Sequence, residues 1–300
     1  MSDFITAAGR KIKVTNQDKV LYPAAGFTKA DLIEYYRRVA PALLPHLRGR
    51  PLTMKRYPNG VDEEFFYQKQ APKHRPEWVT TVPVWSEGNG RDIDFVTVNG
   101  LPTLLWLANL ADIELHTSMS RARTIFRPTM VVFDLDPGPP ASIIECCRVA
   151  LLLRALGKRI GLEMWPKTSG SKGLQLYAPL NSPASYDRTK PFAREVARRL
   201  ERDHPELVVS NMRRDLREGK VLLDWSQNDD MKTTVCVYSL RARERPTVST
   251  PVTWAELRRA VKRDDPSLLV FEWDDVLERV ERDGDLFRPV LTTRQRLPRL

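Results

Sequence analysis

The chain has 300 residues, and its 48 lysines and arginines exceed its 38 aspartates and glutamates, for a formal net charge of +10. A hydrophobic share of 42% is typical of a globular protein and excludes an intrinsically disordered chain. No apolar run reaches the ~20 residues needed to cross a bilayer, and residues 1–14 lack the apolar core of a secretory signal.

The N-terminal third is predicted to contain a strand at residues 11–15 and a turn region over 16–27. Thr28 can cap the helix that follows, because apolar side chains then recur at helical spacing. Many short strand-like segments rich in proline, glycine and aromatic residues occupy residues 51–98. A helical segment over 104–109 then leads to the strand-like residues Ile-Glu-Leu-His.

The apolar run at residues 131–136 is bounded by Pro-Gly-Pro-Pro and predicts a buried strand, with a helix after it. Two more helices are predicted near the C-terminus, one capped by Thr253 and one over 274–283 that ends at Gly284. Because strands and helices do not alternate strictly, we predict an α+β fold with a central mixed β-sheet flanked by helices. Further strands are expected at residues 174–178, 220–225 and 233–239.

Cysteine use and charge suggest where the protein works and what it binds. The sequence has three cysteines, two of them adjacent, which is not a disulfide framework, and no Cys/His cluster has zinc spacing. We therefore expect a cytoplasmic, nucleoid-associated protein without a membrane partner. The excess of positive charge favours a polyanionic ligand, although many basic proteins bind none specifically.

The strongest local signal is the pair Asp134 and Asp136 in the predicted strand 131–136. Strand side chains alternate between faces, so both carboxylates point the same way, and their repulsion calls for a compensating charge such as a divalent metal. Asp224 ends another apolar run and could complete a three-carboxylate site. Three oxygen donors suit Mg²⁺ or Mn²⁺, and two such ions can support phosphoryl or nucleotidyl transfer.

Two other interpretations of this segment stay open. Asp134 and Asp136 could be solvated side chains at an exposed strand end. The segment also looks like the first motif of haloacid-dehalogenase-type phosphatases, although Pro137 and Gly138 follow where that family has threonine or valine.

Residues 168–175, Thr-Ser-Gly-Ser-Lys-Gly-Leu-Gln, form a third candidate element. Small residues let backbone N–H groups approach a ligand, and Ser169, Ser171 and Lys172 add hydroxyls and a cation, as in a phosphate cradle. The spacing of a Walker A loop is absent. A Gly/Ser-rich turn that binds no ligand would show the same sequence pattern.

These elements, in this order, resemble the archaeo-eukaryotic primase superfamily and, more closely, the polymerase domain of bacterial ligase D. The resemblance runs from residue 15 past 243 and implies one primase-like domain over 1–300. Its N-terminal part (~1–110) would contact the 5′-phosphate and template, and ~111–300 would be the catalytic core. The matching segments are TNQDKVLYP (15–23), FTKADLIEYY (27–36), KRYPNGV (55–61), FFYQK (65–69), IELH (113–116), VFDLDPG (132–138), TSGSKGL (168–174), LDWSQN (223–228) and YSLRAR (238–243).

The resemblance implies template-directed nucleotidyl transfer with NTP or dNTP as substrate and two Mn²⁺ or Mg²⁺ ions. Asp134, Asp136 and Asp224 match the family's metal-binding and catalytic triad. The candidates that the resemblance implies for nucleotide binding are His116, Ser169, Ser171, Lys172, Gln175 and Arg241. The resemblance also implies a set of residues that bind the 5′-phosphate and the DNA strands. These are Asn16, Lys19, Lys29, Lys55, Arg56, Phe65, Phe66, Lys69, Arg217 and Lys220.

Physical reasoning supports part of this set. Lys29 falls in the first turn of the helix capped by Thr28, where free N–H groups would attract a phosphate. Phe65 and Phe66 could stack on template bases, or one of them could pack in the core. Without the resemblance, His116 would more often be a core or surface histidine.

The sequence departs from the family in two respects. Gln175 stands where the family usually has histidine, so we expect a weaker contact with phosphate. No ligase or phosphoesterase segment follows Leu300, so the chain is expected to be a stand-alone enzyme or an excised domain.

Three functions follow from these patterns. The leading one is a polymerase at DNA gaps, overhangs and 5′-phosphorylated ends in end joining, working with a Ku-like end-binding protein and a separate DNA ligase. A primase-polymerase for gap filling in excision repair is a second. A DNA-end-binding protein with little turnover is the third, which the intact aspartates disfavour.

Overall fold

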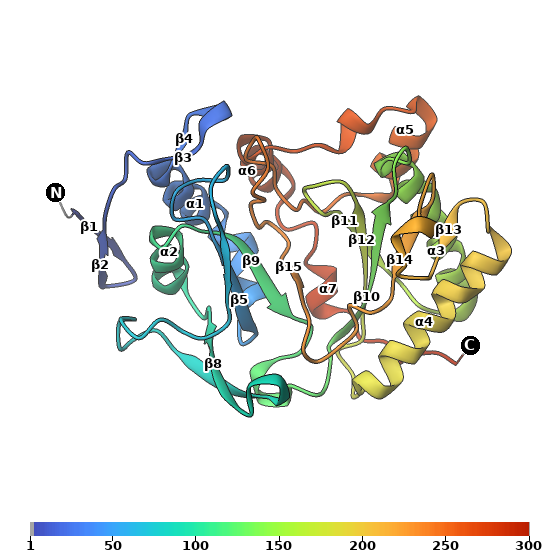
Figure 1. Cartoon of the computed structure of the whole chain (residues 1–300), viewed down its shortest axis with the longest axis horizontal. Coiled ribbons are helices and arrows are strands. Elements are labelled where there is room, and N and C mark those ends of the chain that lie inside the picture. The colour runs from blue at the N-terminus through green and yellow to red at the C-terminus, as the bar shows by residue number, and fades with distance from the viewer. Residues whose placement is uncertain (1–2, 300) are drawn as a thin grey trace. The chain divides into compact units, whose positions relative to one another are not determined.

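A computed structural model describes residues 3–299, and its contacts divide the chain into two compact units. The first unit consists of residues up to Arg123 together with Thr233–Ser249 and Phe271–Asp285. The second consists of Thr124–Lys232, Thr250–Val270 and the residues from Leu286 onward. Seven α-helices and two multi-stranded sheets within residues 3–299 confirm the predicted α+β class (Figure 1).

The first unit is built on an antiparallel sheet with the strand order β15-β9-β5-β8-β7, to which β6 adds through β5. Helix α1 packs against α2. The elements are β1 (Asp3–Ala7), β2 (Arg10–Val14), β3 (Val20–Tyr22), β4 (Phe27–Thr28), α1 (Lys29–Leu47), β5 (Pro51–Arg56), β6 (Phe66–Gln68), β7 (Thr81–Ser86), β8 (Arg91–Thr97), α2 (Leu101–Asn109), β9 (Asp112–Ser118), β15 (Thr233–Val235) and α6 (Trp273–Asp283).

The second unit has a mixed sheet with the order β11-β12-β10-β14-β13, in which β13 alone runs parallel to its neighbour. Helices α3 and α4 pack against β10. The elements are β10 (Met130–Pro137), α3 (Ile143–Ile160), β11 (Trp165–Thr168), β12 (Leu174–Pro179), α4 (Tyr186–Asp203), β13 (Val208–Val209), β14 (Val221–Asp224), α5 (Trp254–Arg263) and α7 (Pro289–Thr292).

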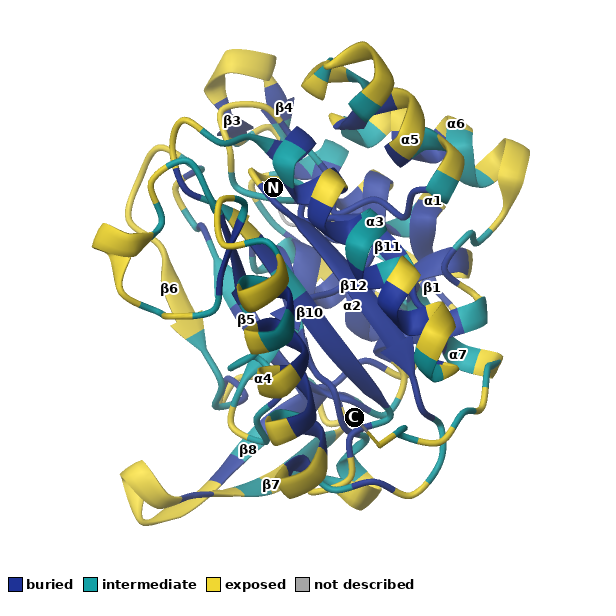
Figure 2. Ribbon diagram, turned by 90° about the vertical axis from the view of Figure 1, so that its right-hand side faces the viewer, coloured by how far each residue is buried: buried dark blue, intermediate teal, exposed yellow. Residues whose placement is uncertain are grey.

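Burial follows the predicted pattern. Figure 2 shows β12 and the first part of β10 in dark blue: β12 is buried throughout, β10 is buried except at Asp134 and from Asp136 onward, and β6 is mostly exposed. The capping box at Thr28 starts α1 as predicted, and Gly284 ends α6. The predicted strand at 233–239 is wrong beyond Val235, because the chain turns at Tyr238, whose φ is 65°.

Three further features bear on the predictions. All three cysteines are buried free thiols, as the sequence predicted. The region predicted as a turn over 16–27 contains the short strand β3. Of the helices within residues 3–299, none combines the length and apolar character needed to span a membrane.

Candidate functional site

In the second unit, the register of four strands brings polar side chains into one row. Asp134 at the centre of β10 faces Asp224 on β14 and Gln175 on β12, and Gln175 in turn faces Lys167 on β11. Directly opposed residues of antiparallel strands point to the same face. The row therefore places two of the three predicted carboxylates opposite each other on the paired strands β10 and β14, with Asp136 two residues along on the same face.

Negative charge is crowded in this row. Burial and the nearby charges of Asp136 and Asp224 together raise the pKa of Asp134 to about 7, against the opposing effects of Gln175 and Lys167. Asp224 is held in place, because the N–H of Ser226 donates to its Oδ1 at 2.8 Å and the Gln227 amide donates to its Oδ2 at 3.2 Å. Such crowding suits a divalent cation with oxygen ligands.

In their present side-chain conformations, the three aspartates do not form a complete metal-binding site. Across residues 3–299, no three His, Cys, Asp or Glu side chains gather in a group that could hold a metal ion. The donor types and the shared face fit Mg²⁺ or Mn²⁺. Coordination by all three carboxylates would require their side chains to turn toward the ion.

The loop between β11 and β12 differs from the simple phosphate cradle that was predicted. The Ser169 hydroxyl accepts hydrogen bonds from the N–H groups of Ser171, at 3.2 Å, and Gly173, at 3.1 Å. Two backbone donors are therefore used inside the loop, and the buried Ser169 hydroxyl braces the turn by accepting both hydrogen bonds. The exposed Ser171 and Lys172 remain available for an anion.

Gly173 explains how this loop lies so close to the carboxylates. A β-carbon at this position would lie 2.2 Å from the carbonyl oxygen of Leu135 and 3.5 Å from Oδ1 of Asp136. Only glycine permits this approach without a shift of the backbone. The loop is thereby held against the strand that carries Asp134 and Asp136.

Gln175 has a different partner from the one predicted. Its side chain is 3% exposed, and its amide donates to Oδ1 of Asp134 at 3.1 Å. The amide therefore positions Asp134. Lys167 is fully buried, and its charge lowers the pKa of Asp134. The sequence did not predict Lys167 as a site residue, because only the pairing of β11 with β12 places it in the row.

We expect Gln175→His to raise kcat/KM for nucleotide addition roughly fivefold, because a charge-assisted hydrogen bond to Asp134 is about 1 kcal/mol stronger than a neutral one. Steady-state primer extension measures the effect. Gln227→His is the matched control, since Gln227 also donates to an aspartate of the site. An unchanged or lower kcat/KM for Gln175→His would contradict the prediction.

The predicted DNA-binding residues Arg217 and Lys220 lie at the end of β10. The N–H of Gly138 donates to the carbonyl of Lys220 at 2.8 Å, and the Arg217 guanidinium donates to the carbonyl of Met212. A β-carbon on Gly138 would collide with the carbonyl oxygen of Arg217, at 1.9 Å. The loop that carries both cations is therefore packed directly behind Asp136.

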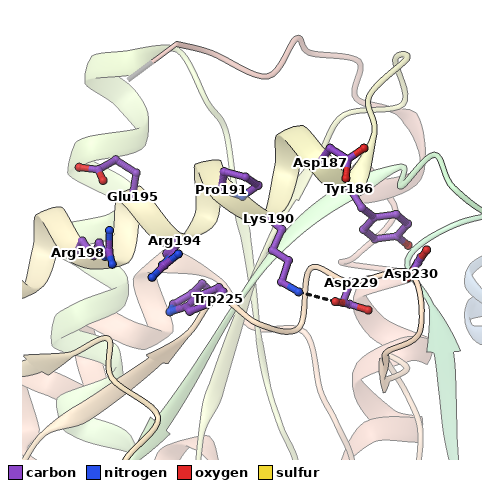
Figure 3. Close-up of a pocket in the computed structure, with 10 residues that line it drawn as sticks. All are labelled: Tyr186, Asp187, Lys190, Pro191, Arg194, Glu195, Arg198, Trp225, Asp229 and Asp230. Atoms are coloured by element: carbon purple, nitrogen blue, oxygen red, sulfur yellow. Dashed lines mark hydrogen bonds and ion pairs between the residues drawn. The ribbon is translucent and has the colours of Figure 1, made fainter. Parts of the chain in front are cut away.

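A pocket of about 700 Å³ lies between α4 and the segment that follows Asp224 (Figure 3). Its wall contains an ion pair and a contact between a cation and an aromatic ring. The Arg194 guanidinium lies 5.1 Å from the centre of the Trp225 ring, and Lys190 pairs with Asp229 at 2.5 Å. We assign this pocket no part in the chemistry of the carboxylates.

In the first unit, Glu114 gathers three residues of the predicted site. Its carboxylate lies 3.2 Å from the Lys55 ammonium, 2.9 Å from Nε2 of His116 and 3.2 Å from Nε of Arg241. Lys55 faces Glu114 across β5 and β9. Glu114 was missed, although its position two residues before His116 in a strand already placed both side chains on one face.

Aromatic rings surround the Lys55 ammonium. It lies 4.4 Å from the centre of the Phe65 ring, 5.2 Å from that of Tyr57 and 5.6 Å from that of Tyr67. Phe66 lies instead against the Arg56 guanidinium, at 5.1 Å. Both phenylalanines are exposed, which excludes core packing for either and leaves both faces of this hairpin open to stacking.

Two other predicted DNA-binding residues of this unit differ in their contacts. Arg56 is already engaged, because its guanidinium donates to the Leu110 carbonyl at 3.0 Å and to the Gln68 side chain at 2.8 Å. Lys69 is only partly exposed, just after β6. Stacking near Arg56 is therefore better supported than a direct phosphate contact by its side chain.

Asn16, Lys19 and Lys29 are brought together at the start of α1. Backbone hydrogen bonds link Lys29 to Lys19 and Lys19 to Asn16. Burial lowers the pKa of Lys29, and the nearby charge of Lys19 lowers it further. Two lysines this close favour an anion between them.

The expected free N–H groups at this helix end are absent among the first three residues of α1. The N–H groups of Lys29 and Ala30 donate to the carbonyls of Lys19 and Gln17, both at 2.9 Å, and that of Asp31 donates to the Thr28 hydroxyl. That part of the prediction is wrong. An anion here would depend on the lysine side chains, of which Lys29 also donates to the Asn109 carbonyl at 3.0 Å.

Comparison with known proteins bears on both the carboxylate row and the residues around Glu114. A family model described as the LigD primase-polymerase domain matches residues 28–287. The multifunctional non-homologous end joining DNA repair protein LigD of Mycobacterium tuberculosis is 43% identical over 291 residues, which cover 94% of this chain and 37% of that protein. The bifunctional non-homologous end joining protein LigD of Bacillus subtilis is 33% identical over 275 residues, which cover 91% of this chain and 43% of that protein.

A solved structure agrees with these relatives. The polymerase domain from Mycobacterium tuberculosis ligase D, in complex with DNA, matches with a TM-score of 0.87 at 42% identity, covering 95% of this chain and 99% of that one. The chain spans well under half the length of the curated relatives named above. On the match to residues 28–287 and these identities, the chain belongs to the LigD primase-polymerase domain family.

Proposed function

We propose that the chain is a metal-dependent, template-directed nucleotidyltransferase that extends DNA ends and fills gaps during non-homologous end joining. The observation that carries the proposal is the row in which Asp134 faces Asp224, with Asp136 on the same face. The names of the relatives in two bacteria support the pathway. The DNA complex of the mycobacterial polymerase domain supports DNA as the substrate.

Asp134, Asp136 and Asp224 would hold two Mn²⁺ or Mg²⁺ ions. Bound there, such ions activate a hydroxyl nucleophile and neutralise the charge of a triphosphate. The chain's own residues bind and orient the reactants. Lys172 and Ser171 bind phosphate from the exposed loop tip, while Ser169, Gly173 and Gln175 hold that loop and Asp134 in place.

The first unit supplies the contacts to nucleic acid and nucleotide. Phe65 and Phe66 stack on bases, for which stacking contributes about 1–3 kcal/mol each. Arg241 binds the triphosphate, and His116 lies against the incoming nucleotide. Lys19 and Lys29 recognise a 5′-phosphate through their side chains, with an end-binding protein and a ligase activity as the expected partners.

The direct test is primer extension on gapped DNA by the purified chain. It should compare Mn²⁺ with Mg²⁺, NTP with dNTP, and substrates with and without a downstream 5′-phosphate. Templated addition that needs a divalent ion is expected. Synthesis from two nucleotides on unprimed template would favour the primase-polymerase alternative, and binding without extension would favour an end-binding protein.

Replacing Lys19 by alanine is expected to weaken the preference for 5′-phosphorylated gaps about tenfold, the effect of losing one charge-assisted contact. Fluorescence anisotropy with matched DNA carrying a 5′-phosphate or a 5′-hydroxyl measures it at fixed salt, since binding depends steeply on salt. Lys11→Ala, at an exposed lysine of β2, is the control. An unchanged ratio of the two affinities for Lys19→Ala would remove Lys19 from the 5′-phosphate site.

A further inference from the structure

Glu114 is a buried carboxylate whose two oxygens both contact neighbouring hydrogen-bond donors and cations. Its Oε1 receives the Lys55 ammonium at 3.2 Å and the N–H of Ala242 at 3.1 Å. Its Oε2 accepts a hydrogen bond from His116 at 2.9 Å and forms an ion pair with Nε of Arg241 at 3.2 Å. Three hydrogen bonds and one ion pair therefore surround the two oxygens, each of which is in contact with two neighbours.

The three side chains around Glu114 come from different parts of the sequence. Lys55 lies on β5, His116 lies on β9 with Glu114, and Arg241 follows β15. Each carries or can carry a positive charge, and each would otherwise repel the others. The single negative charge of Glu114, whose side chain is 2% exposed, holds them together.

The arrangement buries the Glu114 carboxylate among its own partners, with 2% of its side chain exposed. It also leaves the cluster with a net positive charge, because one carboxylate faces two permanent cations and a histidine. The neighbouring charges and hydrogen bonds keep the pKa of Glu114 well below its usual range despite burial, so the carboxylate stays ionised at any working pH.

We infer that Glu114 is a positioning residue, whose carboxylate holds Lys55, His116 and Arg241 in the one arrangement that presents them to DNA and nucleotide. The inference rests on the proposed function for the roles of those three residues. It adds that their geometry depends on one side chain that touches no substrate.

The contact with His116 extends the inference to that ring. An ionised carboxylate only accepts hydrogen bonds, so the Nε2 atom of His116 carries a proton when it contacts Oε2. The ring is then oriented with Nδ1 as its remaining nitrogen. Burial lowers the pKa of His116, while the hydrogen bond and charge of Glu114 oppose that effect.

The test is Glu114→Gln, which keeps the size of the side chain and removes its charge. Asp285→Asn is the matched control, because Asp285 is another carboxylate of the same unit with a side chain only 13% exposed, and its partners are His46 at 2.9 Å and the Tyr238 hydroxyl at 2.8 Å. Neither partner belongs to the proposed site. Loss of general stability should therefore affect both variants alike.

Two readouts separate positioning from a purely structural role. Titration of the four histidines by NMR should show the His116 pKa of Glu114→Gln lower by about one pH unit, because an adjacent negative charge is lost. Steady-state primer extension should show a nucleotide KM about tenfold higher. Asp285→Asn should leave both quantities as in the wild type.

A His116 pKa and a nucleotide KM in Glu114→Gln equal to those of Asp285→Asn would overturn the inference. If Glu114→Gln does not fold, Glu114→Asp keeps the charge on a shorter side chain. It should then retain the His116 pKa but still raise the nucleotide KM, and a wild-type KM would overturn the inference. A wild-type chain that adds no nucleotide would contradict the proposed function, while the histidine titration would still test the contact.

Discussion

Replacing Asp134 by asparagine is expected to lower the rate of nucleotide addition on the order of a thousandfold, as when a preorganised electrostatic group of an active site is lost. Asp134 faces Asp224 directly and shares its face with Asp136, so its charge lies at the centre of the carboxylate row. An amide fits the same space but cannot supply that charge to a divalent ion. Single-turnover primer extension on gapped DNA with Mn²⁺ measures the loss.

The binding of 5′-phosphorylated gaps by Asp134→Asn should stay close to that of the wild type, because the lysines assigned to the phosphate lie in the other unit. Asp229→Asn is the matched control, since Asp229 follows Asp224 closely in the chain and pairs only with Lys190 among the described ion pairs. Extension by Asp134→Asn at the rate of this control would remove Asp134 from the metal site.

The same variant has a predicted effect on stability without metal. The pKa of Asp134 is raised from 3.8 to about 7, so its ionised form is disfavoured in the folded chain. Its contribution to the free energy of unfolding is present below pH 4 and is lost as the pH rises toward 7. At pH 8, with a chelator, Asp134→Asn should therefore be more stable than the wild type by up to about 4 kcal/mol.

Urea unfolding at pH 5 and pH 8 measures this difference. The gain of Asp134→Asn should shrink at pH 5, where the Asp134 carboxyl of the folded wild type is already protonated and only its ionisation in the unfolded chain still costs stability. Adding Mn²⁺ at pH 8 should stabilise the wild type more than the variant. A variant less stable than the wild type at both pH values would contradict the crowding of charge at Asp134.

Gly173→Ala is expected to raise the Kd for nucleotide at least tenfold and to lower the free energy of unfolding by about 1–3 kcal/mol, the usual cost of overpacking a closed site. The added β-carbon would lie 2.2 Å from the Leu135 carbonyl oxygen, so the loop must move away from β10. Lys172 and Ser171 would then lose their place beside the carboxylates. Nucleotide titration and urea unfolding measure the two effects.

Gly88→Ala controls for the substitution itself, because a β-carbon there meets nothing within 4 Å. Its nucleotide affinity and stability should match the wild type within about 1 kcal/mol. A Gly173→Ala variant with the same properties as Gly88→Ala would show that the loop tolerates displacement from β10.

The sequence predicts what depends on local pattern. Alternation within a strand placed Asp134 and Asp136 on one face, and the capping box at Thr28 placed the start of α1. It could not show that Asp224 lies opposite Asp134, because the pairing of strands about ninety residues apart depends on tertiary packing. The resemblance to a known family supplied that grouping instead.

The sequence also could not predict which groups form hydrogen bonds with the site residues. The N–H groups at the start of α1 are taken by the carbonyls of Lys19 and Gln17, which no helix pattern reveals. The amide of Gln175 donates to Asp134, where a family comparison suggested phosphate. In each case the residue type was predicted and the identity of its partner was not.

Residues 169–173 form the turn of a hairpin whose strands β11 and β12 carry Lys167 and Gln175 into the carboxylate row. An extra residue inserted within β12 ahead of Gln175 would turn that side chain to the opposite face of the sheet. The same insertion at the exposed tip, beside Ser171, would leave the paired strands unchanged. The hairpin can therefore vary in length only at its exposed tip, and not within the strands β11 and β12.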